Sequence, residues 1–539
     1  MTKIPKRYMK LTSKTVKWLP LIGVGLMAIG IGVGYLCGSS NNMTPAQQKL
    51  NDIIELINDE YVDEIDQDSL IEMSIADILH NLDPHSMYIP VSELEQANRD
   101  LESSFYGVGV QFQILNDTIC VVQVISGGPA EHEGMLAGDR IIEVDGKKMT
   151  GKDVSNEDVF KALRGPKDTQ VTMKVKRNHV AKPLTFTVTR GEIPSTSVDA
   201  SYMLNDSVGY VRVSKFAGNT YSEFFQALSS LQYKGATKFV LDLRGNGGGL
   251  LDQAILMANE FLEPAYRIVE VRGRHTRENA TWVSDGSGSF TAQKLVVLVD
   301  EFSASSSEIV AGAIQDNDRG LIIGRRTFGK GLVQRAITLP DSSQVRLTVQ
   351  RYYTPSGRCI QKDFVRGHND DYQTEIVDRY SNGEVFSADS IKVDENNVFY
   401  TLSGRTVYGG GGIIPDVFVP SDTSFVTTYY LNVANAGLPI RFAYEYADLN
   451  RESLANVKTV RELLTKLPPA DVLLRAFTSY AAQNGIPQRW YYINISAPLI
   501  INQLRALIAR DILDMNAYFE IVNESDPVIK EALKQLSSE

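Results

Sequence analysis

The chain has 539 residues, of which 43% are hydrophobic and 22% charged, and its net charge is −11. The length allows roughly three to four domains, and the composition is that of a globular protein rather than a collagen-like, coiled-coil or wholly disordered chain. An acidic balance is not typical of a nucleic-acid binder, so we expect no nucleic-acid partner.

The three cysteines and six histidines form no recognisable metal-binding or disulfide pattern. Cys37 lies within an apolar run, and the other two cysteines are Cys120 and Cys359. No cysteine–histidine spacing typical of zinc ligands is visible in the sequence. We therefore expect no metal site.

The N-terminus combines a basic flank with an apolar run. Residues 1–17 contain six lysine or arginine residues and no acidic residue, which leaves a net charge of −17 for residues 18–539. Residues 18–37, WLPLIGVGLMAIGIGVGYLC, carry no charge. About 20 apolar residues can cross a bilayer as a helix, and a basic flank stays in the cytoplasm. We therefore predict a cytoplasmic flank at 1–17 and a transmembrane anchor at 18–37, with a cleaved signal peptide as the alternative.

Residues 44–100 are predicted to form an N-terminal helical region. Apolar residues recur there at helical spacing, at Leu50, Ile53, Ile54, Leu56 and Ile57 and again at Leu70, Ile71, Ile75, Ile78 and Leu79. The segment NLDPHSMYIP then ends the helical pattern with the turn chemistry of proline and aspartate.

Residues 103–192 are predicted to form a small β-rich module with two helices. Short strand-like runs alternate with glycine-rich turns in FYGVGVQFQILNDTICVVQVISGGPAEHEG. A helix is expected from Ser155 to Gly165, and QVTMKVKR and KPLTFTVTR are expected to be two strands joined near Asn178.

Residues 193–424 are predicted to form an α/β core. Strand-like runs such as KFVLDLRG and KLVVLVD alternate with helical segments such as LLDQAILMANEFL, a pattern typical of a sheet covered by helices. Residues 361–405 interrupt it as a polar, weakly patterned excursion, and YGGGGIIPDVFVP returns the chain to the core. Residues 425–539 are predicted to be mostly helical, and they contain no motif that indicates a role.

A glycine-rich loop joins a buried strand to a helix in LDLRGNGGGLLDQA. It contains Gly245, Gly247, Gly248 and Gly249. Such a loop exposes backbone N–H groups, and the positive end of the helix dipole strengthens their attraction for an anion. The segment lacks the G-x-G-x-x-G spacing of a dinucleotide-binding fold, and the alternative is a tight turn without a ligand.

Four serines precede an alanine-rich helix in VDEFSASSSEIVAGAIQDN, namely Ser303, Ser305, Ser306 and Ser307. Helix capping accounts for one of them, with Glu308 in the first helical turn. A serine at a helix start after a buried strand is also well placed as a nucleophile, because the helix end stabilises negative charge on the tetrahedral oxygen.

The segment IIGRRTFGKGLVQR contains most of a phosphate-binding loop, with Gly324, Gly329 and Lys330 at the expected spacing. That loop requires Ser or Thr after the lysine, whereas Gly331 follows here, which argues against a nucleotide-hydrolysing enzyme. The alternative is a lysine base for a serine, since burial lowers the pKa of an amine and Ser–Lys pairs occur among hydrolases. Gln334 lies four positions further on, where its side chain can hydrogen-bond the amine and orient it.

Taken together, four of these elements resemble the carboxyl-terminal processing serine proteases, also called tail-specific proteases. They are SFYGVGV…GGPAEHEGMLAGDRIIEVDGK, LDLRGNGGGLL, SASSSEI and TFGKGLVQ, in this order, and the resemblance covers residues 44–360. It implies a multidomain α/β fold: a protease core with a Ser-Lys active site, an inserted β-rich PDZ domain, and helical regions at both ends.

The resemblance implies a role for each motif. The family pattern S-A-S-A-S-E places the nucleophile at Ser305, with Ser306 in place of the usual alanine. The pattern F-G-K-G places the general base at Lys330, and Gln334 falls on the family's orienting glutamine. The glycine-rich loop resembles the segment that forms the oxyanion hole, which implies Gly248 and the N–H of Ser306 as donors.

The β-rich module resembles a PDZ domain that binds protein C-termini. Its YGVG segment matches the loop whose backbone N–H groups capture a terminal carboxylate, and a peptide then pairs as an added strand along VQFQI. Gly107, Val108, Gly109 and Val110 are therefore expected to bind the substrate tail. The alternative is that this strand edge is only a domain surface.

The resemblance predicts a serine endopeptidase that recognises the C-terminal tails of protein substrates and needs no metal, nucleotide or other cofactor. With the anchor at 18–37, it implies a single-pass protein of the bacterial inner membrane whose catalytic part lies in the periplasm. The helices at 44–80 and beyond 425 resemble parts that family members use to form homodimers. The alternative from another class is a membrane-anchored PDZ scaffold without proteolytic activity, against which the complete Ser–Lys–Gln set argues.

Overall fold

The computed structural model describes residues 44–538 except residues 100, 116, 126 and 179. The predicted basic flank at 1–17 and the predicted anchor at 18–37 lie outside these residues. Within the described part of the chain, no helix is both long and apolar enough to cross a membrane.

The chain divides into two compact units, Met1–Ile75 and Ala76–Glu539. The first unit contains α2 (Pro45–Glu60) and most of α3 (Gln67–His80). The predicted helical region at 44–100 also includes a short strand, β1 (Met87–Ile89), and a third helix, α4 (Val91–Asn98). No residue of α2 is buried.

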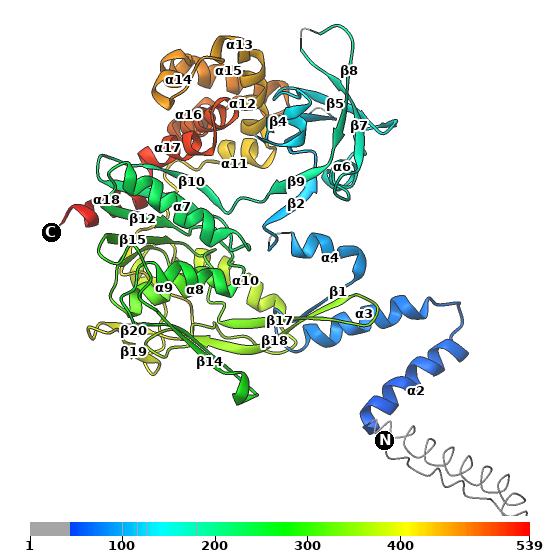
Figure 1. Ribbon diagram of the computed structural model, residues 1–539, viewed down its shortest axis with the longest axis vertical. Coiled ribbons are helices and arrows are strands. Elements are labelled where there is room, and N and C mark those ends of the chain that lie inside the picture. The colour runs from blue at the N-terminus through cyan, green and yellow to red at the C-terminus, as the bar shows by residue number, and fades with distance from the viewer. Residues whose placement is uncertain (1–43, 100, 116, 126, 179, 539) are drawn as a thin grey trace, which may run out of the picture. The chain divides into compact units, whose positions relative to one another are not determined.

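The second unit contains the predicted α/β core, whose sheet has six strands in the order β10-β11-β12-β15-β16-β21. Every neighbouring pair is parallel except β10 with β11. The strands are β10 (Val198–Met203), β11 (Val208–Val213), β12 (Lys238–Asp242), β15 (Lys294–Val299), β16 (Leu321–Gly324) and β21 (Val417–Phe418). Three helices cover one face, namely α7 (Thr220–Tyr233), α8 (Leu251–Asn259) and α9 (Ser306–Asp316) (Figure 1).

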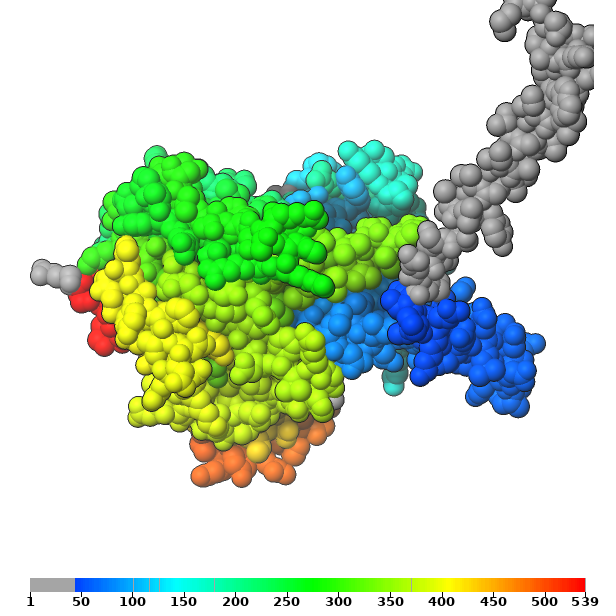
Figure 2. Space-filling model, turned by 90° about the horizontal axis from the view of Figure 1, so that it is seen from below, coloured from blue at the N-terminus to red at the C-terminus, as the bar shows by residue number. Residues whose placement is uncertain are grey.

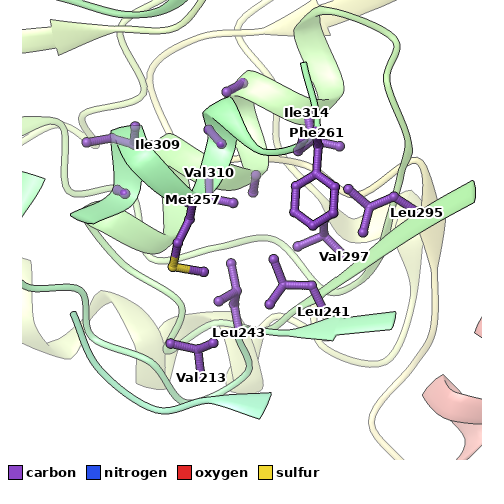
Figure 3. Close-up of a cluster of buried hydrophobic side chains, with 14 of the residues drawn as sticks. Val213, Leu241, Leu243, Met257, Phe261, Leu295, Val297, Ile309, Val310 and Ile314 are labelled. Atoms are coloured by element: carbon purple, nitrogen blue, oxygen red, sulfur yellow. The ribbon is translucent and has the colours of Figure 1, made fainter. Parts of the chain in front are cut away.

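Both faces of this sheet are buried, which explains why its central strands read as unbroken apolar runs. Along β12, Leu241 packs among the side chains of the three helices, whereas Val240 points to the opposite face. Figure 3 shows the first face, where Leu241 and Val297 lie near Met257 and Phe261.

The opposite face is covered by the last helix of the chain, α18 (Pro527–Ser537). Its apolar side chains pack against this face of the sheet; they are Val528, Ile529, Ala532 and Leu536. Part of the predicted C-terminal helical region therefore completes the core of the α/β domain.

A second sheet of five strands has the order β1-β18-β13-β14, with β17 paired to β18. Its strands are β1 (Met87–Ile89), β13 (Arg267–Gly273), β14 (Ala280–Val283), β17 (Leu332–Thr338) and β18 (Gln344–Tyr353), and the short helix η1 (Thr276–Glu278) precedes β14. All of its pairs are antiparallel. The loop between β16 and β17 connects the two sheets and carries Lys330.

The excursion at 361–405 is more regular than its polar sequence indicates. It contains α10 (Asn369–Ser381), η2 (Ala388–Ser390) and β19 (Val398–Tyr400), which pairs with β20 (Thr406–Tyr408). In yellow-green and yellow, it forms much of the face of the core seen in Figure 2. Several of its charged side chains are buried in ion pairs, and a search for apolar periodicity cannot detect such a core.

The β-rich module has a sheet in the order β3-β4-β5-β7-β8, with β6 paired to β5. Its elements are β3 (Val110–Leu115), β4 (Thr118–Val124), α5 (Pro129–His132), β5 (Arg140–Val144), β6 (Lys147–Lys148), α6 (Asn156–Leu163), β7 (Gln170–Lys176) and β8 (Leu184–Thr189). The pair β2 (Ser104–Gly107) and β9 (Gly191–Pro194) leads into and out of the module, and α4 (Val91–Asn98) precedes it. Alternate residues of β7 are buried, as expected for a strand with one face on a core.

The C-terminal region is helical, as predicted. Its helices are α11 (Thr428–Asn435), α12 (Leu438–Leu449), α13 (Arg451–Leu454), α14 (Val460–Lys466), α15 (Ala470–Gln483), α16 (Trp490–Ile512), α17 (Met515–Ser525) and α18. On α12, Asp448 accepts hydrogen bonds from Arg140 and Asn178 of the β-rich module, both at 2.8 Å. This helix therefore contacts the β-rich module directly.

Candidate active site

Ser305 lies between β15 and α9, with α9 beginning at the next residue. Its φ of 53° is positive, which costs a non-glycine residue about 1–3 kcal/mol and is most often found at functional sites. The residue is half-buried and sits at the positive end of the helix dipole. This conformation presents the side chain at the mouth of the helix.

The other three serines bind the glycine-rich loop and the strand before it. Their hydroxyls donate to backbone carbonyls: Ser303 to Leu243 at 2.8 Å, Ser306 to Gly249 at 2.9 Å and Ser307 to Asn246 at 2.9 Å. These bonds explain why four small hydroxyl residues occur together. Among the described residues, Ser305 is the one of the four whose hydroxyl makes no such bond to the loop.

Glu308 holds the backbones of Ser305 and Lys330 with one carboxylate. Its Oε2 accepts the N–H of Ser305 at 2.8 Å and that of Lys330 at 2.9 Å. Its Oε1 accepts the N–H of Gly329 at 2.7 Å and the hydroxyl of Thr327 at 2.6 Å. Burial raises the pKa of the Glu308 carboxyl, and the four hydrogen bonds oppose that shift. Two residues that are 25 positions apart in the sequence are thus brought to a single oxygen atom.

Lys330 has the environment that a neutral amine requires. Burial lowers the pKa of the Lys330 amine below its ordinary value, and Arg346 acts in the same direction, whereas the carboxylates of Glu308 and Asp83 oppose the shift. The amine makes no hydrogen bond to any described residue. It is therefore available to a hydroxyl proton.

Gln334 is held by a partner that the sequence did not indicate. Its Nε2 donates to Thr348 Oγ1 at 3.2 Å, and that hydroxyl donates to Asp83 Oδ1 at 3.0 Å. Within the described part of the chain, Gln334 makes no hydrogen bond to the Lys330 amine. The orienting role predicted for Gln334 is therefore not visible in these contacts, and Asp83 and Thr348 join the site instead.

His85 also lies near the lysine, although it is far away in the sequence. Burial and the charge of Lys330 lower the pKa of His85 to about 3, so its imidazole is neutral at pH 7. Its Nε2 is hydrogen-bonded to the hydroxyl of Tyr372 at 2.9 Å. The proline and aspartate of NLDPHS predict a turn, and the structure shows that Asp83 and His85 of this turn also lie close to the lysine. An aspartate and a histidine on either side of a proline are the signal that the sequence offers for this.

The glycine-rich loop touches the nucleophile candidate directly. A Cβ added to Gly248 would lie 2.7 Å from Ser305 Cβ and 3.0 Å from the Ser306 nitrogen. The Gly248 N–H, however, donates to Asn246 Oδ1 at 2.9 Å, so it is engaged rather than free for an oxyanion. The Ser306 N–H has no hydrogen-bond partner among the described residues.

The predicted tail-binding loop precedes the edge strand of the β-rich module. β3 is the first strand in the sheet order, so one side of it is unpaired. The carbonyls of Val108 and Gly109 accept from Ala130 and Ile125, at 2.8 Å and 2.9 Å. Their N–H groups donate to no described residue. Such a loop beside an open strand edge has the groups that a peptide C-terminus needs.

No group of three or more His, Cys, Asp or Glu side chains in the described chain is arranged to hold a metal ion.

Comparisons with known proteins identify relatives of this chain. The model described as "Peptidase family S41" matches residues 207–373, and that described as "PDZ domain" matches residues 120–177. A third, "Family of unknown function (DUF8443)", matches residues 429–514.

Two curated relatives are bacterial carboxy-terminal processing proteases. The chain is 39% identical over 347 residues to a carboxy-terminal-processing protease of Bartonella bacilliformis, covering 63% of this chain and 78% of that protein. It is 35% identical over 358 residues to the carboxy-terminal processing protease CtpB of Bacillus subtilis, covering 65% and 72%. Among solved structures, a photosystem II D1 C-terminal processing protease matches at 30% identity and a TM-score of 0.34, covering 60% of this chain and 92% of that one.

Proposed function

Because the chain belongs to the carboxy-terminal processing proteases of peptidase family S41 and contains a PDZ domain, we propose that it cleaves proteins whose C-terminal tails its PDZ domain has bound, with Ser305 as nucleophile and Lys330 as general base. The observation that carries this proposal is the carboxylate of Glu308, which accepts the backbone N–H of both residues.

In the proposed reaction, the neutral amine of Lys330 takes the hydroxyl proton of Ser305 as Oγ bonds to the peptide carbonyl carbon. The electron pair of the carbonyl moves onto its oxygen, which the Ser306 N–H stabilises. A donor of this kind contributes about 3 kcal/mol. The Gly248 N–H can act as the second donor after it leaves Asn246.

The tetrahedral intermediate then breaks its C–N bond, and the ammonium of Lys330 gives its proton to the leaving amine. A water molecule attacks the resulting ester, with Lys330 again taking a proton, and the second product leaves with the new carboxylate. Ser305 recovers its hydroxyl proton from Lys330. Gln334 is proposed to orient the Lys330 amine, for which its side chain would exchange the hydrogen bond to Thr348 for one to the amine.

Tail recognition is proposed for the loop of Gly107, Val108, Gly109 and Val110. The N–H groups of Val108 and Gly109 donate to the terminal carboxylate, and the tail pairs with the open edge of β3. Binding the tail raises the local concentration of the rest of the substrate at Ser305.

Membrane attachment is also a proposal. The uncharged residues 18–37 after a basic flank would place a single-pass anchor in a bacterial inner membrane, with the catalytic part in the periplasm. Association into homodimers through helical regions belongs to the same set of expectations.

The function is tested with the purified full chain in detergent and an unfolded substrate that ends in an apolar tail. We expect cleavage by the wild type and by Ser306→Ala, and none by Ser305→Ala. An otherwise identical substrate with an amidated C-terminus should be cleaved more slowly. Tail binding without any Ser305-dependent cleavage would contradict the protease and favour the scaffold.

A further inference from the structure

The segment from Arg325 to Gly331, here called the base loop, is held from two sides. Its N–H groups at Gly329 and Lys330 donate to Glu308, as described above. The carbonyls of Arg326, Thr327, Phe328 and Gly329 accept hydrogen bonds from the excursion, from Arg379 and from the N–H of Lys362. The loop is also bonded to neighbours outside the excursion, since Phe328 N–H donates to Ser303 O and Thr327 N–H to Ile413 O, both at 3.0 Å. Among these contacts, Arg379 is the side chain of the excursion that binds the carbonyls of three consecutive residues of the loop.

Arg379 of α10 binds the carbonyls of three consecutive residues in the base loop. Its Nη1 donates to Arg326 O at 3.2 Å and to Thr327 O at 2.8 Å, and its Nη2 donates to Phe328 O at 3.0 Å. These residues immediately precede Gly329 and Lys330. One guanidinium thus fixes the backbone that leads into the base.

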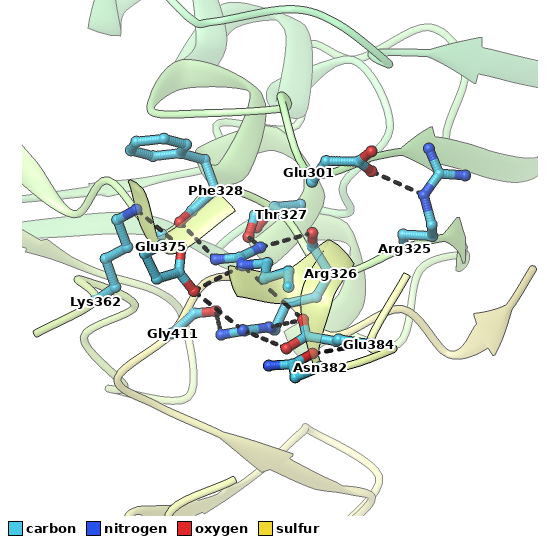
Figure 4. A network of polar contacts seen from close by, with 12 residues as sticks. Glu301, Arg325, Arg326, Thr327, Phe328, Lys362, Glu375, Asn382, Glu384 and Gly411 are labelled. Atoms are coloured by element: carbon cyan, nitrogen blue, oxygen red, sulfur yellow. Dashed lines mark hydrogen bonds and ion pairs between the residues drawn. The ribbon is translucent and has the colours of Figure 1, made fainter. Parts of the chain in front are cut away.

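The guanidinium of Arg379 is itself buried and held by a carboxylate. Its side chain is only 2% exposed, and its Nε donates to Glu375 Oε1 at 2.7 Å. Glu375 also binds Lys362 at 3.0 Å, and Arg326 pairs with Glu384 (Figure 4). In this cluster the carboxylates of Glu375 and Glu384 pair with three cations, those of Arg326, Lys362 and Arg379. The base-loop carbonyls supply the further acceptors that the donors of the cluster need.

The cluster also contacts two aromatic rings, those of Phe328 in the base loop and Tyr372 in α10. The amine of Lys362 lies 4.0 Å from the ring centroid of Phe328 and 4.1 Å from that of Tyr372. It donates to the carbonyl of Tyr372 at 2.9 Å. The excursion therefore contacts the base loop through both its backbone and the side chain of Phe328.

We propose that Arg379 is a positioning residue for the Ser305–Lys330 reaction, because it holds the backbone of the base loop, whose Lys330 N–H shares a Glu308 oxygen with the N–H of Ser305. This inference rests on the proposed function of that pair.

Arg379 acts through the backbone and not through its charge. The charged and titratable groups that face the Lys330 amine are Glu308 from α9, Arg346 from β18, and Asp83 and His85 from the turn after α3. None of them lies on α10. Loss of Arg379 should therefore change the hydration of the amine rather than a direct Coulomb interaction.

The test is Arg379→Met in the full chain, which replaces the guanidinium with an uncharged side chain. A loosened base loop lets water solvate the ammonium, so the pKa of Lys330 rises and less of it is neutral at pH 7. We expect the acid limb of the kcat profile to move about one unit to higher pH and kcat at pH 7 to fall about tenfold. KM for a tail-bearing substrate should stay unchanged, and alkaline pH should restore most of the rate.

Arg319 offers a matched control. It also binds three backbone carbonyls, those of Phe261, Phe290 and Gln293 at 2.6, 2.8 and 2.6 Å, and none of them belongs to the base loop. Arg319→Met should lower the unfolding temperature about as much as Arg379→Met does. The pH dependence of kcat, measured per folded molecule, should be the same for Arg319→Met as for the wild type. If Arg379→Met does not fold, Arg379→Lys, which keeps the charge and one donor, should show a smaller shift of the same sign.

The inference is overturned if the folded Arg379 variants keep the wild-type kcat and pH profile, or if Arg319→Met shifts the profile equally. Two further variants separate this outcome from failure of the proposed function. Cleavage that survives Ser305→Ala and Lys330→Met refutes the function itself. If Ser305→Ala and Lys330→Met are inactive but Arg379→Met keeps the wild-type pH dependence of kcat, only the role of Arg379 is refuted.

Discussion

At the scale of single residues, the site depends on burying a lysine without giving its amine a partner. An amine with an ordinary pKa of about 10.4 is almost wholly charged at pH 7, and burial disfavours the charged form. Glu308 is the carboxylate that could form an ion pair with Lys330. Its two oxygens instead accept hydrogen bonds from three backbone N–H groups and a hydroxyl. The lysine is thereby kept near a negative charge without forming an ion pair to it.

Replacing the lysine should remove activity and increase stability. Lys330→Met should lower kcat by roughly 10²–10⁴-fold or more, the usual contribution of a general base. The folded-state pKa of Lys330 is lowered, so between that pKa and about 10.4 the unfolded chain binds more protons and the wild type loses stability as pH falls. The variant escapes this loss.

Thermal unfolding of both proteins between pH 6 and pH 10 measures the effect. The melting temperature of Lys330→Met should exceed that of the wild type at pH 7, and the difference should shrink as pH rises, at about 1.4 kcal/mol per unit of pKa shift. A constant difference across this range would mean that Lys330 is not buried in its neutral form.

At the scale of elements, the start of α9 and the glycine-rich loop form one structure. The hydroxyls of Ser303, Ser306 and Ser307 bind loop carbonyls, and the backbone of Gly248 leaves no room for a side chain against Ser305. Gly248 also has a φ of +99°, which a residue with a Cβ adopts only under strain. Ser305, the proposed nucleophile, is thus positioned by a close backbone approach that only glycine permits.

A matched pair of glycine substitutions tests this approach. An added Cβ at Gly248 would displace Ser305, whereas one at Gly247 meets nothing within 4 Å. Gly248→Ala should reduce kcat by about 10²-fold, as does loss of an oxyanion donor, and Gly247→Ala should leave kcat within a few-fold of the wild type. Steady-state kinetics on the same substrate measures both. Equal effects would show that the loop acts only through its general flexibility.

At the scale of the whole molecule, the catalytic sheet is completed from the end of the chain. The family match to the peptidase ends at residue 373, yet α18 covers the second face of the sheet with Val528, Ile529, Ala532 and Leu536. Lys238 and Lys294 donate from the sheet to the carbonyls of Leu536 and Ser538. The C-terminal region is therefore part of the peptidase fold of this chain.

A charge placed under α18 should unfold the core. Ala532 is fully buried, and Ala532→Asp leaves an uncompensated carboxylate in an apolar cluster, at a cost of roughly 3–5 kcal/mol. Lys534→Ala on the same helix is the control, because that side chain is 73% exposed. Denaturant unfolding should show a large loss for the first variant and less than about 0.5 kcal/mol for the second. A protease core that keeps its stability with Ala532→Asp would show that α18 is dispensable.

The sequence allowed prediction of the parts of the molecule that follow simple periodicity or turn chemistry. β12 and β15 read as buried strands because both of their faces are apolar, and α9 was recognisable from Ser305 and Glu308 at its start. The sequence alone also brought Ser305 and Lys330 into one hypothesis, and the structure places their backbones on a common carboxylate.

Other parts could not be predicted, for physical reasons. Arg379 looks like a solvent-exposed residue of a polar segment, because pairing with Glu375 and not hydrophobicity allows its side chain to be buried. The turn at Asp83 is brought to Gln334 by the second sheet, a contact between distant segments that local pattern does not encode. An amphipathic helix such as α18 indicates that it covers an apolar surface without indicating which one.

The position of α18 near the end of the sequence affects the order in which the core can be completed during synthesis. A growing polypeptide leaves the ribosome with its N-terminus first. The segments of Ser305 and Lys330 therefore emerge well before α18, the helix that covers the second face of their sheet. Until α18 has left the ribosome, one face of that sheet lacks the apolar side chains that bury it. The order of residues along the chain thus delays burial of this face of the sheet until α18 has been synthesised.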